Sequence, residues 1–489
     1  MHDVVVIGGG IAGLTTAFDL VRRGLDAVVL EAGSTPGGNI GTLEVDGYRL
    51  ETGPHSFMGS AENVWRLVEA LGVEDEVEPA SAAAANRYIV RDGRLMALPM
   101  SAMSFLTSGV LTFGGKLRLA AEPFIGNGAD PQETAWDFFS RRFGEEAATY
   151  IMSPFISGVY AGDIRALGAR AAFPKFWGFE RETGSMIRGA MRYMREKRKR
   201  LVAEGKTVRK GLYSTRGGLG GLIAKVADTL GQRFCPGVEV QALEAVAGGV
   251  AAHTDGGAIV GRMAVLAAPP HRAAPLLERA IPSASELMRS IPMVPVTVAH
   301  WTCAATSSAE VPAGFGFLVP RVSGIHVLGT LFPSQLFAGR APDGRHLFAS
   351  YYGGATDPAA ATLSDEELRE LVVAEHEQIF GGTLDDVGLL RVLRHGAAIP
   401  QLLPDHPERI EALWREVGAV SGLVLAGNYL TGVGIEAAAE SGFEAAVRCA
   451  EHLEARRILS GASSGRSSSP SPVQRRRESC IEWQQRGVE

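Results

Sequence analysis

The stretch from residue 4 to residue 31 constrains the fold more than any other, because it contains the parts of a nucleotide-binding βαβ unit in order. Residues 4–7 (Val-Val-Val-Ile) are apolar and β-branched, which predicts a strand buried on both faces of a parallel sheet. Gly8, Gly10 and Gly13 follow directly and open a helix predicted over residues 11–23. In this pattern the glycines permit a tight turn, close approach of a pyrophosphate and close packing of the helix on the strand. The helix N-terminus then offers unpaired N–H groups to the phosphates.

The second half of the unit returns to the same sheet and ends in an acid. Residues 27–30 (Ala-Val-Val-Leu) predict a second parallel strand, and Glu31 follows it at once. Glu31 stands after Gly13 at close to the spacing of roughly 20 residues at which an acid accepts hydrogen bonds from a ribose diol. The glycines alone would also fit an ordinary turn, but the complete order of elements predicts a dinucleotide site.

The length and charge of the chain limit what surrounds this unit. With 489 residues, 46% of them hydrophobic, the chain can bury a large core and is expected to form two or three lobes. A net charge of −6 gives no indication of nucleic-acid binding. The first predicted strand leaves no room for a signal peptide before it, so we expect a cytoplasmic protein. Without CxxC spacing or a histidine cluster nearby, the cysteines are expected to be reduced thiols and not metal ligands: Cys235, Cys303, Cys449 and Cys480.

A second glycine pair and a hairpin follow the βαβ unit. Gly37 and Gly38 give another place where bare backbone can approach a diphosphate, although an ordinary loop would contain them as well. Residues 42–45 and 48–51 predict a hairpin around an Asp-Gly turn, and the turn Gly53-Pro54 comes next. This arrangement resembles the entry to the flavin site in a large group of flavin oxidases. It therefore favours FAD over NAD.

Two further stretches suggest contact with a membrane. Residues 95–115 contain no charged side chain, but Pro99 and several glycines interrupt them. A helical lobe lying on a bilayer surface is the preferred interpretation, with a buried core and a membrane-spanning helix as alternatives. Residues 188–210 carry ten Lys or Arg and two acids. This basic stretch would contact anionic lipid or carboxylates, or else form a solvated helix and loop.

The remaining predicted elements divide the chain among several lobes. Strands over residues 265–268 and 423–426 are expected to return to the first sheet, so the nucleotide lobe is assembled from separated segments. Glycines 432 and 434 open a long helix that ends near residue 453, and its dipole would favour an anionic reduced flavin. Further strands are predicted over residues 87–90, 94–96, 238–240, 294–301, 314–319 and 346–352, and helices over residues 219–230 and 364–380.

Several motifs carry a family resemblance over nearly the whole chain. The narrow ones are residues 157–163 (Ser-Gly-Val-Tyr-Ala-Gly-Asp) and 314–320 (Gly-Phe-Gly-Phe-Leu-Val-Pro); the others are residues 8–13, Glu31, 86–88 (Asn-Arg-Tyr), 399–401 (Ile-Pro-Gln) and 432–433. With these motifs the sequence resembles the oxygen-dependent protoporphyrinogen oxidases of haem biosynthesis. The resemblance implies FAD as the cofactor, a porphyrinogen and molecular oxygen as substrates, and hydrogen peroxide as a product. The flavin would carry the hydride chemistry, so no catalytic side chain or metal is required.

The resemblance also implies which residues form the site. Arg87 would pair with a propionate of the tetrapyrrole, Phe315, Gly316 and Leu318 would pack against its ring, and Gly162 would lie in the same site. FAD contacts are implied for Gly8, Gly9, Gly10, Ile11, Ala12, Gly13, Glu31, Ala32, Gly38, Asn39, Gly53, Pro54, His55, Ser56, Val240, Gly427, Asn428, Val433, Gly434 and Ile435. For His55 a polar contact to the ligand is one interpretation, and a loop histidine with partners of its own is the favoured one.

The implied architecture is α/β with three lobes. A Rossmann-type FAD-binding domain would comprise residues 1–85, 211–270 and 405–457, and an α+β substrate-binding domain residues 86–98 and 271–404. A helical membrane-binding domain would cover residues 99–210. Residues 458–489 are rich in Ser and then basic without periodicity, which predicts a disordered tail. Such a protein would be cytoplasmic, peripherally associated with the cytoplasmic membrane, and compatible with a homodimer.

The sequence departs from the family pattern at two places. Leu402 stands where the family usually has Tyr, and residues 436–438 (Glu-Ala-Ala) stand where it often has Asn-Asp-Cys. Both departures concern side-chain details near the flavin edge, and neither affects the cofactor site that the backbone forms.

Three alternative functions compete with this interpretation, and the narrow motifs argue against the amine oxidase among them. A coproporphyrinogen III oxidase would act on a related substrate with four carboxylates, and Arg87 alone does not separate it from a protoporphyrinogen oxidase. An amine oxidase of the same fold is the second possibility. A non-enzymatic escort protein of this fold is the third.

Overall fold

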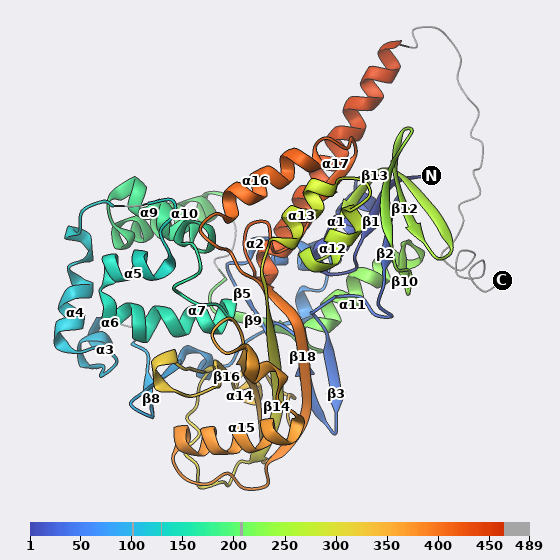
Figure 1. Cartoon of the computed structure of the whole chain (residues 1–489). Coiled ribbons are helices and arrows are strands. Elements are labelled where there is room, and N and C mark those ends of the chain that lie inside the picture. Colours follow the sequence, from blue (N-terminus) through green and yellow to red (C-terminus); the bar gives the residue numbers. More distant parts are fainter. Residues whose placement is uncertain (100–101, 129, 206–208, 464–489) are drawn as a thin grey trace.

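The computed structural model describes residues 1–99, 102–128, 130–205 and 209–463. Figure 1 shows three regions: a first sheet with its helices at the upper right, a second sheet with helix α15 below it, and a group of helices from α3 to α10 at the left. The predicted α/β class is confirmed, with parallel and antiparallel strand pairs.

The first sheet carries the N-terminal βαβ unit. Its strands in spatial order are β10 (Phe234–Pro236), β2 (Ala27–Glu31), β1 (His2–Ile7), β13 (Gly257–Leu266), β12 (Gly249–Thr254) and β11 (Ala242–Val246), with β19 (Leu423–Leu425) also paired to β13. The strands β10, β2, β1, β13 and β19 pair in parallel, whereas β11, β12 and β13 pair antiparallel. The sheet is thus built from segments far apart in the sequence, as predicted.

Both faces of this sheet are buried, which explains the uninterrupted apolar run in β1. Val4 and Val6 pack into one core, and Val5 and Ile7 into another. Helices α1 (Ile11–Arg22), α2 (Glu62–Leu71), α11 (Leu219–Leu230) and α17 (Ile435–Ser463) supply the first core. Helices α12 (Pro270–Leu277), α13 (Pro282–Arg289) and α16 (His406–Val417) supply the second.

The prediction of a strand at residues 238–240 is wrong. This segment connects β10 to β11, because its backbone crosses the end of β2: the Gly237 N–H donates to Gly33 O at 2.9 Å, and the Val238 N–H donates to Glu31 O at 2.9 Å. A segment in which apolar and polar residues alternate therefore need not form a strand. Here its backbone N–H groups bond to the end of β2 and not to a neighbouring strand.

The second sheet is mainly antiparallel and has two different faces. Its order is β18 (Gly388–Pro400), β14 (Met293–Ala304), β17 (Arg345–Gly353), β16 (Gly329–Leu331), β15 (Gly316–Leu318), β7 (Tyr88–Arg91) and β8 (Arg94–Ala97). Helix α15 (Asp365–Phe380) covers one face, and a smaller apolar cluster that includes Val296, Val298 and Ala161 lies on the other. The long strand β18 was not predicted, since its burial does not alternate.

Two small sheets join the main ones. The predicted hairpin β3 (Thr42–Val45) and β4 (Tyr48–Glu51) is confirmed, with Asp46 and Gly47 at positive φ. Strands β5 (Phe57–Met58), β6 (Val77–Pro79) and β9 (Leu212–Thr215) form a three-stranded sheet.

The helical region contains α3 (Ala102–Thr107), α4 (Phe113–Ala120), α5 (Ala135–Phe143), α6 (Glu145–Ala147), α7 (Ser153–Tyr160), α8 (Ala169–Ala172), α9 (Pro174–Thr183) and α10 (Met186–Ala203). A core of its own holds it together, and the fully buried Arg142 pairs there with Glu122 and Glu180. The uncharged run at residues 95–115 is divided between β8, α3 and the start of α4. Among the described residues, no helix combines the length and apolar character needed to cross a membrane.

Helix α17 reaches Ser463, ten residues beyond the predicted end near residue 453 and into the predicted tail. The rest of that tail lies outside the described residues.

Cys303 and Cys449 are free thiols, as expected. Cys235 is disulfide-bonded, so the prediction is wrong for this residue; pairings between distant cysteines cannot be deduced from sequence spacing. Cys480 lies outside the described residues.

Candidate active site

The turn between β1 and α1 leaves an open space at the helix N-terminus. Gly8 has a φ of +107°, a conformation that favours glycine. A Cβ on Gly13 would lie 2.0 Å from the Gly8 carbonyl oxygen, so the helix can pack here only with glycine. A Cβ on Gly10 would meet no protein atom within 4 Å, and no side chain caps α1 at this residue. The free N–H groups of the helix therefore face a space that an anionic group can enter.

The second glycine pair lies against the first. The Gly37 N–H donates to Gly9 O at 2.8 Å, and Gly37 forms a parallel bridge with Gly10. Gly38 has a φ of +61°, and its Cβ would be 3.5 Å from the Gly10 Cα. Two stretches of bare backbone thus meet at one place, which is the arrangement that a diphosphate requires.

Glu31 holds the end of β2 in place. Its Oε2 accepts from the Gly9 N–H at 2.5 Å, and its Oε1 accepts from the Gly33 N–H at 2.7 Å. Each carboxylate oxygen retains further acceptor capacity, so contact with a ribose is still available. Val240, on the segment that crosses this edge, is buried.

The Gly53-Pro54 turn touches the second glycine loop. A Cβ on Gly53 would lie 2.2 Å from Asn39 O, and the Thr52 hydroxyl donates to the same oxygen at 3.1 Å. Two histidines of the second sheet fix the preceding backbone: His300 Nε2 lies 3.0 Å from Glu51 O, and His395 Nε2 lies 3.1 Å from Thr52 O. The turn is therefore positioned from both sheets.

His55 has no partner in the part of the chain that the structure describes. Its side chain is only 5% exposed, and its Nε2 is buried without a hydrogen bond. The nearest rings are His300 and Tyr351, with centroids at 5.9 and 6.5 Å. Burial, His300 and Arg340 hold the pKa of His55 well below its usual range. The favoured interpretation of a loop histidine with partners of its own is therefore wrong.

The last glycine turn belongs to the same site. Gly427 follows β19 with a φ of +150°, and its N–H donates to Ser441 Oγ of α17 at 2.8 Å. The Asn428 amide donates to Val433 O at 3.3 Å, and α17 starts at Ile435. A Cβ on Gly434 would meet nothing within 4 Å, which leaves a second open helix N-terminus.

These turns converge because their strands are parallel neighbours. Gly8 follows β1, Glu31 ends β2 and Gly427 follows β19, so all three lie at the carboxyl edge of one sheet. Along this edge Glu31 comes first, then the Gly8 turn and then the Gly427 turn, an order that fits an extended dinucleotide.

Three of the substrate residues predicted on the second sheet share one face, whereas Phe315 packs against the cluster of Ala84, Leu336 and Phe337. In the parallel pair of β15 with β7, Leu318 lies beside Ile89, which places Gly316, Leu318 and Arg87 on the same side. Arg87 is half-buried, its guanidinium lies 5.5 Å from the Phe315 ring centroid, and within the described residues it has no ion pair. Leu318 packs closely against Gly158 of α7.

Gly162 lies beyond the end of α7, next to Gln401. A Cβ on Gly162 would be 2.8 Å from Gln401 Oε1, and the Gln401 amide donates to Tyr160 O at 3.0 Å. Leu402 is fully buried in the helical core, and its carbonyl accepts from the Gly168 N–H at 2.8 Å. The Leu402 side chain therefore packs within the helical region, in a cluster that Val433 of the last glycine turn also contacts.

Comparison with known proteins gives the family. The model of the flavin containing amine oxidoreductase family matches residues 11–450. The chain belongs to this family. The protein is accordingly an FAD-dependent oxidoreductase, and the carboxyl edge described above fits FAD.

The relatives of this flavin oxidoreductase include proteins named as protoporphyrinogen oxidases and proteins named as coproporphyrinogen III oxidases. The chain is 30% identical to protoporphyrinogen oxidase 1, chloroplastic, of Arabidopsis thaliana, over 91% of this chain and 87% of the relative. It is 28% identical to the coproporphyrinogen III oxidase of Bacillus subtilis, over 88% of this chain and 94% of the relative. The solved structure of cyclohexylamine oxidase from Brevibacterium oxydans has the same fold, with a TM-score of 0.65, 18% identity, and coverage of 93% of this chain and 99% of that one.

A buried ion pair that the sequence did not reveal supports the Gly53 turn of this oxidoreductase. Arg340 and Glu51 are each 2% exposed, and Arg340 Nη1 donates to Glu51 Oε1 at 2.8 Å. Glu51 also accepts from Thr42 Oγ1 at 2.8 Å and from the Leu219 N–H at 3.2 Å. Arg340 donates further to Ser214 Oγ at 3.0 Å. The ion pair joins the loop that precedes β17 of the second sheet to the hairpin β3–β4, which leads into the Gly53-Pro54 turn.

Glu436, the other departure from the family pattern, caps helix α2. Its carboxylate accepts from the backbone N–H groups of Asn63 at 2.9 Å and Val64 at 3.1 Å. A carboxylate at a helix N-terminus interacts favourably with the helix dipole. The side chain therefore fastens α17 to α2.

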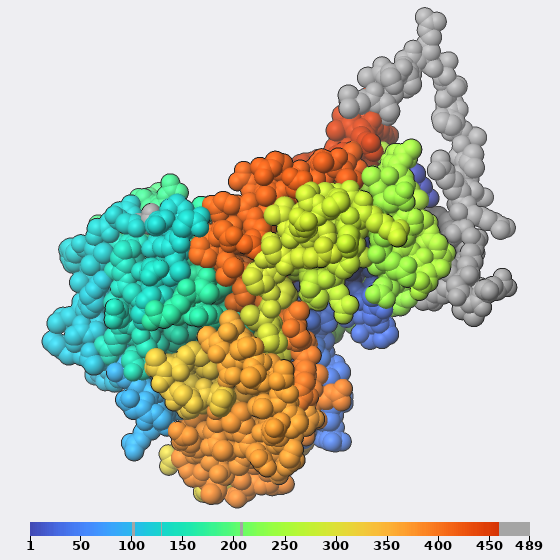
Figure 2. All heavy atoms as spheres, in the orientation of Figure 1, coloured from blue at the N-terminus to red at the C-terminus, as the bar shows by residue number. Residues whose placement is uncertain are grey.

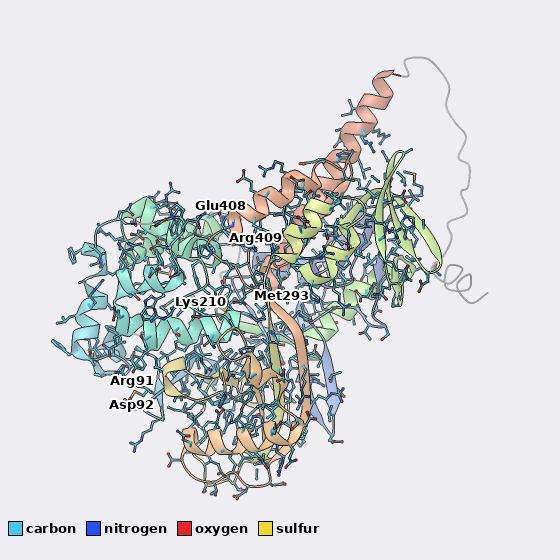
Figure 3. The ribbon with its side chains drawn as sticks, in the orientation of Figure 1. Arg91, Asp92, Lys210, Met293, Glu408 and Arg409 are labelled. Atoms are coloured by element: carbon cyan, nitrogen blue, oxygen red, sulfur yellow. The ribbon has the colours of Figure 1, made fainter. Side chains whose placement is uncertain are left out.

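The helical region contacts the FAD-binding part through charged groups. Arg170 of α8 pairs with Glu408 of α16 at 3.0 Å, and Figure 3 shows Glu408 and Arg409 at the start of α16, on the side of the helical region. Lys197 and Arg200 of α10 pair with Glu62 of α2 at 2.9 and 3.1 Å. Part of the basic stretch at residues 188–210 therefore binds carboxylates of this chain.

Proposed function

We propose that this protein oxidises protoporphyrinogen IX to protoporphyrin IX, with oxygen as the electron acceptor and release of hydrogen peroxide, in haem biosynthesis. The observation that carries the proposal is Arg87, a half-buried cation without an ion pair in the described chain that lies beside an aromatic ring on the face holding Gly316 and Leu318. An apolar surface with one free guanidinium suits a large apolar macrocycle that carries propionates. The names of the relatives support this substrate class.

The chain's own residues would bind and orient the substrate and exclude water, and bound FAD would supply the hydride acceptor. Arg87 would form a forked hydrogen bond with a propionate, while Phe315, Gly316, Leu318 and Gly162 would contact the ring. The glycine turns, Glu31, residues 53–56 and Val240 would hold FAD along the carboxyl edge of the first sheet. The sequence ranges proposed for the FAD domain, 1–85, 211–270 and 405–457, contain the parallel strands of that sheet.

The second candidate substrate is coproporphyrinogen III, because relatives with that name match at 28% and 26% identity. It carries four carboxylates, which would call for more cations on this face. The neighbouring Arg91 is paired with Glu146 at 3.1 Å and hydrogen-bonded to Val110 O, so it is already used within the chain. This pairing favours the substrate with fewer carboxylates.

We also propose that the helical region associates peripherally with the cytoplasmic membrane. Its outer helices α3 and α4 lie at the edge of the molecule, where Figure 2 displays them farthest from the first sheet. Large apolar side chains are exposed on and next to them: Met103, Leu106, Phe113, Leu117 and Phe124. Such a group of exposed apolar residues is typical of an interaction surface.

The test is to offer protoporphyrinogen IX and coproporphyrinogen III in parallel to the FAD-loaded protein and to follow porphyrin fluorescence and peroxide. Preference for protoporphyrinogen IX supports the proposal, and preference for coproporphyrinogen III supports the second candidate. A protein that binds FAD but oxidises neither would refute both. Cyclohexylamine and other amines serve as control substrates for an amine oxidase.

A further inference from the structure

Helix α7 ends in a backbone conformation that the rest of the fold must hold in place. Ala161, the residue after α7, has a φ of +45° and a ψ of +30°, in the left-handed region that residues other than glycine rarely adopt. Such a conformation costs free energy and persists where the surrounding contacts determine it. The contacts that surround Ala161 therefore fix where α7 ends.

The second sheet supplies these contacts from the ends of two strands. Beyond β17, the Ala355 N–H donates to Ala161 O at 2.8 Å. Gly354 has a φ of +77°, and a Cβ on it would lie 2.5 Å from the same oxygen, so this close approach requires glycine. Beyond β18, the side-chain amide of Gln401 donates to Tyr160 O at 3.0 Å. The carbonyls of Tyr160 and Ala161 are thus both bound by the second sheet.

Gln401 is itself held firmly at the end of β18. It is 4% exposed, and its backbone N–H donates to Pro292 O at 2.8 Å. Its amide nitrogen also donates to Ile399 O at 3.3 Å. A primary amide has two N–H donors, and here both have a carbonyl oxygen as partner. The orientation of the amide is therefore determined, because the opposite orientation would place its own oxygen against two carbonyl oxygens.

Helix α7 also contacts the residues that we propose for the substrate. Figure 1 shows α7 on the side of the helical region nearest the second sheet, where Leu318 packs closely against Gly158. Phe155 and Val159 lie on the same side of the helix as Gly158 and are exposed. Gly162 follows the bound carbonyl of Ala161 directly. A shift of the end of α7 would therefore move Gly162 and change the contact with Leu318 together.

We propose that Gln401 is a positioning residue for the porphyrinogen. Its amide N–H groups hold the end of α7 against the second sheet and so set the distance between α7 and the face that carries Arg87, Gly316 and Leu318. The proposal rests on the proposed function. Apolar contacts weaken strongly when a gap of about 1 Å opens, so a macrocycle held between two walls depends on their separation. The effect falls on binding of the macrocycle more than on the hydride step.

The experiment compares Gln401→Leu with the wild type, both loaded with FAD. Leucine donates no hydrogen bond, so the KM for protoporphyrinogen IX should rise at least about fivefold, the lower limit for the loss of two neutral hydrogen bonds. The kcat should stay within about threefold, and the FAD content should not change. The control is Ser285→Ala, which removes an equally buried donor to a carbonyl, Ala274 O at 2.7 Å between α12 and α13, and should leave KM unchanged.

A second variant, Gln401→Glu, separates positioning from a direct contact with the substrate. An ionised Glu keeps the side-chain oxygen but has no donor, so KM should be raised at pH 8 and return towards the wild-type value as the carboxyl is protonated at lower pH. The ratio to the wild type at each pH removes the titration of the substrate propionates. Tyr160, the neighbouring titratable residue, has its pKa raised to about 12 by burial and does not titrate in this range.

A wild-type KM in Gln401→Glu at pH 8, with a raised KM in Gln401→Leu, would show that the oxygen of Gln401 contacts the substrate directly and would overturn the proposal. An unchanged KM in Gln401→Leu, or a collapse of kcat at constant KM, would overturn it as well. If Gln401→Leu does not fold, the pH dependence of KM in Gln401→Glu decides alone. A wild type that forms no porphyrin would instead refute the proposed function, so the two failures are distinguishable.

Discussion

Removal of the Arg340 guanidinium should destabilise the protein strongly, because it would leave Glu51 as an unpaired buried carboxylate. Both side chains are 2% exposed, and the ion pair is also hydrogen-bonded to Thr42, the Leu219 N–H and Ser214. Breaking a buried pair by removing one partner costs about 3–5 kcal/mol. We therefore expect Arg340→Met to lower the free energy of unfolding by about that amount at pH 8.

The pH dependence separates this explanation from loss of packing. Burial raises the pKa of Glu51, opposed by Arg340, Thr42 and the Leu219 N–H. Without Arg340 the folded-state pKa should rise further. A carboxyl with a raised folded pKa has its full stability below the unfolded pKa and loses it as pH rises through the folded value. The deficit of Arg340→Met should therefore be smaller at pH 5 than at pH 8.

The assay is urea unfolding of FAD-free protein followed by tryptophan fluorescence, with FAD affinity as a second measurement. The control is Arg289→Met, which breaks an exposed pair with Glu278 and should cost less than about 1 kcal/mol. In the double variant Glu51→Gln/Arg340→Met both charges are absent, so it should be no less stable than Arg340→Met. A single variant within about 0.5 kcal/mol of wild type at pH 8, or a deficit independent of pH, would refute the reasoning.

Four more outcomes follow from the structure. Arg87→Ala should raise KM for the porphyrinogen by about 10- to 150-fold, which corresponds to the loss of one charge-assisted hydrogen bond. The kcat should stay within a few-fold, and the FAD content should not change. A collapse of kcat at constant KM would contradict the placement of Arg87 on a propionate. Gly10→Val should fold but lack FAD in visible absorbance, because the side chain would fill the open space at α1; wild-type FAD occupancy would remove this turn from the site. Phe113→Ser combined with Phe124→Ser should weaken co-sedimentation with acidic liposomes, since these rings are 77% and 88% exposed, and unchanged binding would exclude this surface. His376 is buried, and burial lowers its pKa to about 4, so the histidine of the unfolded state takes up a proton first as pH falls below 6.5. The free energy of unfolding should therefore drop by up to about 3 kcal/mol by pH 4. If His376→Gln shows the same dependence of unfolding free energy on pH as the wild type, this explanation is contradicted.

The features that depend on neighbours along the chain could be predicted from the amino-acid sequence. Residues 4–31 contain a strand, three spaced glycines, a helix and an acid, so the phosphate turn follows from one segment. The hairpin around Asp46-Gly47 is equally local, because positive φ at these residues follows from their type. The parallel part of the first sheet followed from apolar runs without alternation.

Which distant side chains meet depends on the packing of the whole chain. Glu51 and Arg340 are 289 residues apart, and the sequence around either residue does not indicate that the other is its partner. His55 was expected to have partners of its own, and the positions of β14 and β17 show that none reaches its Nε2 within the described chain. The basic residues of α10 were candidates for lipid contact, but Glu62 lies beside two of them. Sequence periodicity reports which face of an element is buried, whereas hydrogen bonding and charge pairing depend on which elements pack together, and that is fixed by the fold.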